Sequence, residues 1–319
     1  MDALSDLMHV LRFTSGVFLD VTLRTPWCIR AQLTQNDCGP GVDASGGIVA
    51  FHFLLDGKLH LRLDQEAPRV CGPGDLILVP RNDPHWLGMD LTLPPLQAAR
   101  EIRRAGEYEM PYLDFGDGPE VLNRFVCGFL TTGVRGHPVL EALPPLLVTN
   151  VRGRPSAEWV ESSFRYAARE HAAHRPGSQD ILGRLSELLF VEAVREHIER
   201  LPANATGWFA ALRDPSLARA MSAMHGRPAH PWTAEDLARE ACLSRSAFAE
   251  KFTATVSVPP MSYLTHWRML LAGQRPRESS DTIAQIAATV GYESEFTFSR
   301  AFRREMGCAP GAWRKKESA

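Results

Sequence analysis

The sequence of 319 residues lacks a long apolar run, a strong net charge and any regular spacing of cysteines. Its longest apolar stretch, GGIVAFHFLL, has ten residues, whereas a membrane-spanning helix needs about 20. The first residues carry Asp2 and Asp6 but no basic segment, so we expect no signal peptide. The six cysteines occur singly and without a CxxC pair, which is typical of reduced thiols. We therefore expect a cytoplasmic protein without a membrane partner.

Motifs of the common enzyme classes are also missing. The chain contains no GxSxG, no HExxH and no phosphate-cradling glycine loop, and its 11 histidines are scattered. We therefore expect no enzymatic activity, no catalytic residue, no bound metal and no cofactor.

The near-neutral charge hides an uneven distribution. The net charge is −2 for the whole chain, but residues 214–319 hold 14 Lys and Arg against 11 Asp and Glu, a net +3. Within residues 300–316 there are six basic side chains and one acidic one. A local basic surface of this kind is what phosphate binding requires.

Short strands and turns dominate residues 15–95. The segments are rich in Val, Ile, Leu and Phe and are bounded by turn residues: GVFLDVTL, GGIVAFHFLLDG, KLHLRLD and GDLILVPR. In KLHLRL, Leu59, Leu61 and Leu63 face one way. Asp56-Gly57 can adopt the positive φ of a tight turn, which predicts a hairpin. The pattern favours an antiparallel sandwich or small barrel.

Residues 96–210 have a more helical character. The clearest helix is predicted over 179–201, where apolar residues recur at i, i+3 and i+4. Its apolar stripe is wide, so either a helix of a second chain or ordinary packing within one chain could cover it.

The most informative feature is an internal repeat. TAEDLAREACLSRSAFAEKF (233–252) and TIAQIAATVGYESEFTFSRAF (282–302) each predict a short helix, a turn and a second helix with Phe at i and i+4. Gly291 can take the left-handed conformation that the second turn needs. A plain helical hairpin would also fit one copy. Two copies joined by the helix-like PPMSYLTHWRMLLAG favour helix-turn-helix motifs that bind DNA.

At these residues the chain resembles the C-terminal domain of AraC/XylS-type bacterial transcription regulators. The strongest match is IAATVGYESEFTFSRAFRREMGCAPGAWRK, and the resemblance covers about the last 105 residues. It implies two helix-turn-helix motifs held by a linker helix, with both recognition helices entering successive major-groove segments on one face of DNA.

Helical geometry predicts which side chains face DNA if Phe248, Phe252, Phe298 and Phe302 face the core. Arg300 is the best candidate for reading guanine, and Phe296 could pack on a thymine methyl. The predicted DNA-facing residues are Arg245, Ser246, Glu250, Thr253, Glu295, Phe296, Thr297, Arg300, Arg303 and Arg304. Arg304, Arg314, Lys315 and Lys316 suit phosphate contacts, which position the protein without specifying sequence.

The N-terminal segment HFLLDGKLHLRLDQEAPRVCGPGDLILVPRNDPH resembles the cupin-type sensor domain of the same regulators. Catalytic cupins bind a metal through a His pair, a Glu and a later His. Here Ala50 stands in place of the Glu, and residues 44–46 read Ala-Ser-Gly where the His pair would fall. His52 and His85 remain, and two imidazoles could bind an effector.

Two alternatives stay open beside a ligand-controlled regulator. One is a metal-dependent cupin enzyme or metal sensor with a DNA-binding tail. The other is a regulator switched by oxidation of Cys71 or Cys127, since a stabilised and accessible thiolate can act as a redox sensor.

Together these patterns predict an α+β protein in three parts. Residues 1–95 form a cupin-like antiparallel β-barrel or sandwich that senses, residues 96–210 a helical linker and dimerisation region, and residues 211–319 an all-α DNA-binding domain with two helix-turn-helix motifs. We expect a homodimeric transcription regulator that binds double-stranded promoter DNA, responds to a small-molecule or oxidant effector and has RNA polymerase as a further partner.

Overall fold

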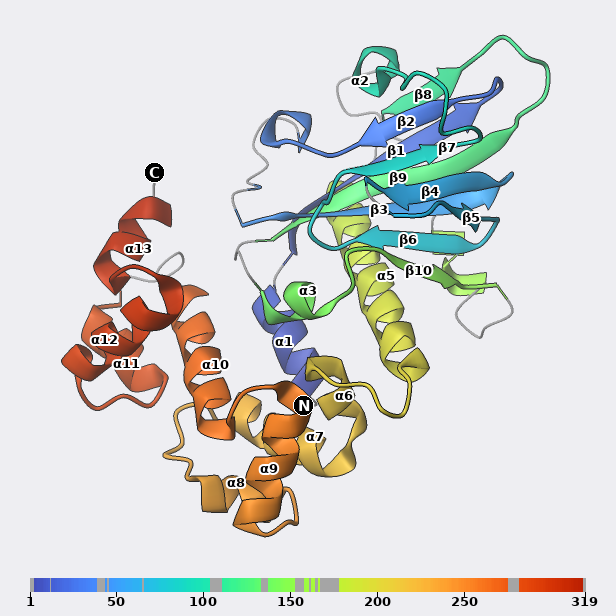
Figure 1. Ribbon diagram of the computed structural model, residues 1–319. Helices are drawn as coiled ribbons and strands as arrows, with labels where there is room; N and C mark the ends of the chain where they lie inside the picture. Colours follow the sequence, from blue (N-terminus) through green and yellow to red (C-terminus); the bar gives the residue numbers. More distant parts are fainter. Residues whose placement is uncertain are drawn as a thin grey trace. The chain divides into compact units, whose positions relative to one another are not determined.

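The computed structural model divides into two units (Figure 1). The sheet unit spans residues 13–197, and the helical unit combines residues 1–12 with residues 198–319. The structure describes residues 3–317 apart from 12, 39–43, 45, 65, 104–110, 133–136, 153–157, 161, 164–165, 167–177 and 275–280.

Two sheets form the sheet unit. One has the strand order β10-β6-β3-β9-β1-β8 and the other β2-β7-β4-β5, and every pairing is antiparallel except that of β1 with β8. The strands are β1 Phe13–Leu23, β2 Cys28–Ala31, β3 Ile48–Asp56, β4 Leu59–Leu63, β5 Arg69–Cys71, β6 Asp75–Val79, β7 His85–Gly88, β8 Tyr112–Phe115, β9 Asn123–Thr132 and β10 Leu147–Asn150. The predicted antiparallel β architecture is confirmed.

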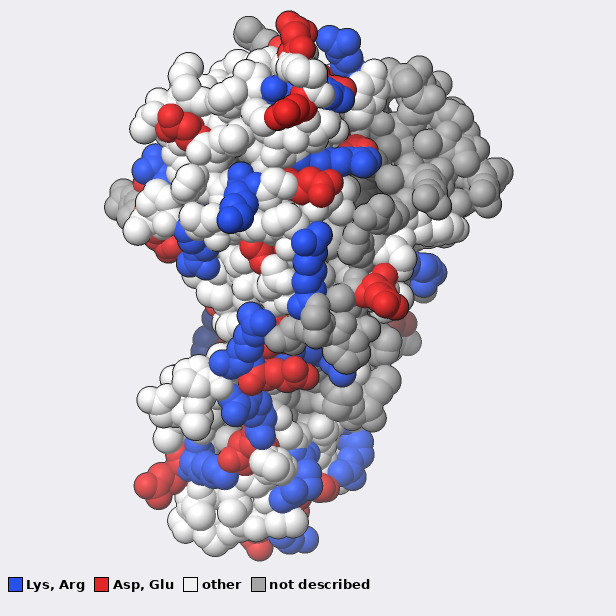
Figure 2. Space-filling model, turned by 90° about the vertical axis from the view of Figure 1, so that its right-hand side faces the viewer, with Lys and Arg blue, Asp and Glu red and all other residues white. Residues whose placement is uncertain are grey.

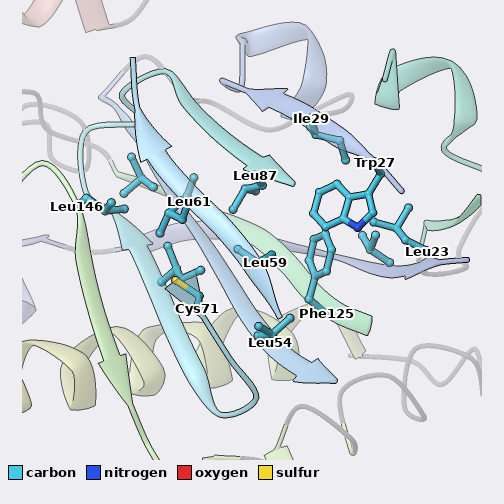
Figure 3. Close-up of a cluster of buried hydrophobic side chains, with 14 of the residues drawn as sticks. Leu23, Trp27, Ile29, Leu54, Leu59, Leu61, Cys71, Leu87, Phe125 and Leu146 are labelled. Atoms are coloured by element: carbon cyan, nitrogen blue, oxygen red, sulfur yellow. The ribbon is translucent and has the colours of Figure 1, made fainter. Parts of the chain in front are cut away.

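Alternation along the strands builds the core between the sheets. Leu59, Leu61 and Leu63 of β4 are buried as predicted. Figure 3 shows the first two pointing into the same cluster as Trp27 and Phe125, whose rings stack with centroids 5.4 Å apart. Burying large apolar side chains contributes about 1.5–3 kcal/mol each, so this cluster stabilises the sheet unit.

The turn at Asp56-Gly57 is a correction to the predicted hairpin. Gly57 has the expected positive φ of +83°, but β3 and β4 belong to different sheets. A Cβ at Gly57 would lie 2.1 Å from the Leu122 carbonyl oxygen. The side-chain amide of Asn123 donates to the carbonyl of Lys58 at 3.1 Å. The start of β9 therefore packs against this turn, and the chain passes from one sheet into the other.

The predicted helical character of residues 96–210 is wrong for Tyr112–Phe115, Asn123–Thr132 and Leu147–Asn150, which form strands β8, β9 and β10. β9 lies between β1 and β3 and pairs with both. Backbone N–H and C=O groups of buried strands need partners, so tertiary pairing decides the structure of this segment. The helices here are α2 Ala98–Glu101, α3 Pro138–Ala142 and α5 Ser178–Arg200, and η1 Gln35–Cys38 is a short 3-10 turn earlier in the unit. α5 confirms the helix predicted over 179–201.

The helical unit contains both predicted helix-turn-helix motifs. The first is α8 with α9 and the second is α11 with α12, and α10 is the helix that links them. The helices are α1 Ala3–Leu11, α6 Trp208–Arg213, α7 Pro215–Gly226, α8 Ala234–Glu240, α9 Arg245–Val256, α10 Pro260–Gln274, α11 Ile283–Thr289, α12 Glu295–Met306 and α13 Pro310–Glu317.

Helix α1 departs from the predicted division of the chain. The sequence predicts one domain over residues 1–95, but α1 packs against α7 and α10 in the helical unit. Among the side chains of α1 that the structure describes, Ala3, Met8 and Leu11 are buried. An amphipathic helix needs a surface that covers its apolar face, and here helices from the other end of the chain provide it.

On the face that Figure 2 shows, Lys and Arg side chains are interspersed with Asp and Glu in both units. Among the described residues, no helix has the length and apolar character needed to cross a bilayer.

Candidate nucleic-acid interface and buried histidine pair

Matching caps start the four helices of the two motifs. Thr233 begins α8 and Thr282 begins α11, each in a reciprocal capping box with the residue three positions later. Ser244 caps α9 by accepting from the amide of Ala247, and Ser294 caps α12 in the same way. A side-chain cap stabilises a helix by about 1 kcal/mol, so each short helix begins at a defined residue.

Pairs of phenylalanines fix the orientation of the second helix in each motif. Phe248 and Phe252 of α9 are fully buried, as are Phe298 and Phe302 of α12. The predicted core side chains are therefore confirmed. The predicted DNA-facing residues on the other side of these helices are all exposed: Arg245, Ser246, Glu250, Thr253, Glu295, Phe296, Thr297, Arg300, Arg303 and Arg304.

Helix α12 presents an unusual combination of groups. Phe296 is 71% exposed, and the guanidinium of Arg300 lies 5.8 Å from the centre of its ring. Arg303 is exposed, while Nε of Arg304 lies 3.1 Å from a carboxylate oxygen of Glu305. An arginine beside an exposed aromatic ring suits recognition of a base pair by hydrogen bonds and apolar contact.

Helix α9 is less basic than its sequence suggests. Nζ of Lys251 is 2.5 Å from a carboxylate oxygen of Asp214 and donates to the hydroxyl of Ser216 at 3.0 Å. Both partners lie at the start of α7, so Lys251 joins α9 to α7. Arg245 and Glu250 are left as the charged side chains among the predicted contacts of α9.

The basic tail is partly used for packing. Nη2 of Arg314 donates to the backbone carbonyl of Asp281 at 2.6 Å, which connects α13 to the segment before α11. Its predicted phosphate contact therefore competes with an internal hydrogen bond. The side chains of Lys315 and Lys316 lie outside the described residues.

The structure brings together the two histidines predicted as an effector site. His52 of β3 and His85 of β7 come from opposite sheets, and their Nε2 atoms are 2.8 Å apart. Both side chains are buried. Burial lowers the pKa of both imidazoles, and repulsion from His85 lowers the pKa of His52 further. Both rings are therefore neutral at neutral pH.

Hydrogen bonding fixes the tautomers of this pair. Nδ1 of His85 lies 2.8 Å from the carbonyl oxygen of Asp83, which can only accept, so that nitrogen carries the proton. Nε2 of His85 must then accept from Nε2–H of His52. Nδ1 of His52 is left as a buried acceptor without a partner among the described residues. A polar ligand with a donor group would satisfy it.

The two cysteines proposed as redox sensors lie in the sheet unit, where Cys71 is buried and Cys127 is half-buried. Burial raises the pKa of the Cys71 thiol to about 12, and burial likewise raises that of Cys127 to about 12. A redox sensor needs a stabilised and accessible thiolate, which a raised thiol pKa disfavours. The part of the chain that the structure describes contains no group of three His, Cys, Asp or Glu side chains able to hold a metal ion.

Two basic residues, Lys251 and Arg268, have structural roles that the sequence patterns do not reveal. Arg268 of α10 donates to carbonyls before α8 and lies over the ring of Tyr292. Arg268 does stand out in the sequence, because it is the only Lys, Arg, Asp or Glu side chain in the helical segment PMSYLTHWRMLLAGQ. A single charge in an apolar helix calls for specific partners, but the sequence does not show where they are.

Comparison with known proteins gives matches along most of the chain. A cupin family model matches residues 2–199, and a helix-turn-helix domain model matches residues 237–316. An AraC-like transcription regulator of Streptomyces lividans is 32% identical over 99% of this chain and 98% of its own. The transcriptional regulator AlkR of Acinetobacter baylyi is 30% identical over 99% of this chain and 100% of its own. Among solved structures, the DNA-binding domain of AdpA in complex with a target DNA has 26% identity and a TM-score of 0.31, covering 32% of this chain and 92% of that one.

Proposed function

Because this chain belongs to the family of AraC-like DNA-binding transcription regulators and carries an N-terminal cupin domain, we propose that both recognition helices read one operator under the control of an effector bound by the sheet unit. The proposal includes no catalytic step. Its residue assignments concern the exposed faces of α9 and α12 and the buried histidine pair.

The exposed face of α12 is the observation that carries the operator-reading role. Phe296 is 71% exposed beside Arg300, so its apolar ring contacts water in the free protein. A thymine methyl group would cover this ring in the complex with DNA. Arg300 then pairs with guanine, while Arg303 and Arg304 contact phosphates. On α9, the corresponding contacts come from Arg245, with Ser246, Glu250 and Thr253 next to the bases.

The buried histidine pair supports the proposal that a small polar effector binds within the sheet unit. Nδ1 of His52 is an unsatisfied buried acceptor, which costs about 1–3 kcal/mol until a donor reaches it. The hydrogen bond from Nδ1–H of His85 to the carbonyl of Asp83 fixes the orientation of the His85 ring. An effector shifts the protein toward the DNA-competent state only if it binds that state more tightly.

The proposal also includes a homodimer, RNA polymerase as a partner and the bacterial cytoplasm as the location. A homodimer would cover Leu188, which is 50% exposed on α5 although Leu189 and Phe190 beside it are buried. RNA polymerase would be the target of the bound regulator, and the site of action would be chromosomal DNA in the bacterial cytoplasm.

Selection of genomic DNA fragments by the purified full-length chain tests the operator role. We expect a small set of fragments that share one sequence with two half-sites. Binding to all fragments alike, or to none, would refute sequence-specific regulation. Genes beside the selected fragments would suggest which effectors to assay.

Matched histidine variants test the sensor site. His52→Ala and His85→Ala should abolish the effect of an active compound on operator binding, while His60→Ala should not, because His60 is exposed on the neighbouring strand β4. Metal analysis of the same proteins checks the alternative. A stoichiometric metal that disappears only in the His52 and His85 variants would replace the small-ligand proposal with a metal sensor.

A further inference from the structure

We propose that Arg268 and Gly291 lock the two helix-turn-helix motifs at one separation, so that the protein reads the spacing between its half-sites as well as their bases. This inference rests on the proposed function, because it requires α9 and α12 to contact the same DNA. We call the contact made by Arg268, Gly291, Tyr292 and Ala229 the inter-motif lock.

The first component of the inter-motif lock is a single arginine on α10. Nε of Arg268 donates to the carbonyl of Pro228 at 2.7 Å, and Nη2 donates to the carbonyl of His230 at 2.7 Å. Both carbonyls lie in the segment between α7 and α8, on the side of the first motif. The planar fork of a guanidinium holds two such acceptors in a fixed direction.

The same guanidinium also contacts the second motif. It lies 5.9 Å from the centre of the Tyr292 ring, in the turn between α11 and α12. The ring of Tyr292 in turn packs edge-on against Phe298 of the α12 core, with centroids 5.7 Å apart. One side chain of the linker helix therefore contacts both the segment that leads into the first motif and the turn of the second motif.

The second component is a direct contact between backbones. Gly291 has a φ of +82°, and a Cβ there would lie 2.7 Å from the carbonyl oxygen of Ala229 and 3.0 Å from its Cα. No side chain fits into this gap without moving one backbone away from the other. The turn of the second motif is thus seated on the segment that precedes the first.

The internal repeat shows that this glycine is not required by the turn alone. Cys242 stands 49 residues earlier, at the equivalent place in the first turn, and has a φ of +56°. It is exposed, so the first turn accepts a side chain in the left-handed conformation. The second turn differs because the Ala229 backbone occupies the space that a side chain would need.

Locked motifs have a consequence on DNA. Successive major-groove segments on one face are about 34 Å apart, so each added base pair moves and rotates one half-site relative to the other. Two motifs joined flexibly could adjust their separation to the new spacing. Two motifs held at a fixed separation would lose contacts with one half-site. Lost base contacts should weaken binding by about tenfold or more for a shift of one or two base pairs.

Spacer variants of a selected operator provide the main test. The wild-type chain should lose about tenfold or more in affinity when one or two base pairs are added or removed between the half-sites. Arg268→Ala should bind the original operator less tightly but show a clearly smaller spacing penalty. Arg219→Ala is the matched control, since Arg219 also donates to two carbonyls, of Glu240 and Ala241, but within the first motif and its neighbouring α7. It should keep the wild-type penalty.

A glycine pair separates the backbone contact from backbone strain. Gly291→Ala and Gly307→Ala both place a side chain at positive φ, +82° and +78°, but only the former meets another backbone. Both variants should unfold more easily. Gly291→Ala alone should reduce the spacing penalty.

A distance measurement without DNA provides the second readout. Nitroxide labels on Cys242 and Cys308 place one probe beside each motif in a full-length chain carrying Cys127→Ala. A narrow distance distribution is expected for the otherwise wild-type chain and for Arg219→Ala, and a broad one for Arg268→Ala. Equal spacing penalties and equally narrow distributions in the wild-type chain and Arg268→Ala would overturn the inference. If the wild-type chain binds no selected duplex, the proposed function is refuted. The inference about half-site spacing depends on that function and is then refuted too.

Discussion

His225 shows how hydrogen-bond accounting determines the state of one residue. The indole of Trp208 can only donate, and its Nε1 lies 2.8 Å from the Tyr263 hydroxyl, which therefore accepts. That hydroxyl donates to Nε2 of His225 at 2.7 Å. Nδ1–H of His225 then faces the carbonyl of Ala3 at 3.3 Å. The neutral ring completes a chain of buried hydrogen bonds that links α6, α10, α7 and α1.

The neutral state of His225 predicts a pH dependence of stability. Burial lowers its pKa from 6.5 to about 4, so the unfolded chain binds this proton more readily than the folded one. Its contribution is present above pH 6.5 and is lost as the pH falls toward 4, by about 3 kcal/mol in all. Urea unfolding of the full-length chain at several pH values measures this. The loss should be smaller in His225→Phe, and an identical pH profile would contradict the assignment.

Arg300 carries the second prediction at the scale of single residues. Arg300→Ala should cost about 1–3 kcal/mol at the operator and relax the preference at one base pair. Arg304→Ala should instead weaken binding to all sequences and reduce the salt slope by about one. Competition binding against random duplexes distinguishes the two. An equal loss on operator and random DNA for Arg300→Ala would show that it contacts phosphate only.

At the scale of elements, α9 and α12 have the same architecture but different surfaces. Both are capped by serine and anchored by two buried phenylalanines. α12 exposes three arginines and a phenylalanine, while the lysine of α9 is paired with Asp214 and Glu250 is exposed. We therefore expect the second motif to contribute most of the electrostatic attraction to DNA.

Glu250 tests this difference between the helices. If it only repels phosphates, Glu250→Gln should raise affinity for every duplex by roughly threefold at low salt. If the Glu250 carboxylate instead accepts a hydrogen bond from a cytosine amino group, Glu250→Gln should lower affinity for the operator and raise affinity for random DNA. Glu235→Gln on α8 is the control, because Glu235 is exposed but lies off the recognition helix.

At the scale of the whole molecule, both ends of the chain belong to the helical unit. Residues 1–12 and 198–319 form it together, so the chain connects the two units twice. α1 packs against α7 and α10, and its side chains Ala3, Met8 and Leu11 are buried. The segment directly before the sheet unit is thus part of the core that supports the DNA-binding helices.

Leu11 predicts how much that helix contributes. Leu11→Ala should lower the free energy of unfolding by about 2–5 kcal/mol, because Leu11 is fully buried. Met261→Ala, at an exposed position of α10, should change it by less than about 1 kcal/mol. Thermal unfolding and operator binding measure both variants. If Leu11→Ala is as stable as Met261→Ala, α1 does not support the helical unit.

Local patterns in the sequence were sufficient for the paired motifs. Periodic apolar residues, the phenylalanine pairs and the repeat predicted α8, α9, α11 and α12, together with the exposed face around Arg300. The alternation in KLHLRL predicted the buried leucines of β4 equally well. These features depend on neighbours a few residues apart, so the sequence alone contains them.

Only the tertiary structure decided features that join distant segments. β9 became a central strand because β1 and β3 required a partner, and α1 joined helices more than 200 residues away. His52 and His85 had been candidates, but their contact depends on how two sheets face each other. Arg268 gained its role from carbonyls placed by another helix pair. The physical reason is that packing and strand pairing depend on partners brought together only by the fold, which local periodicity does not encode.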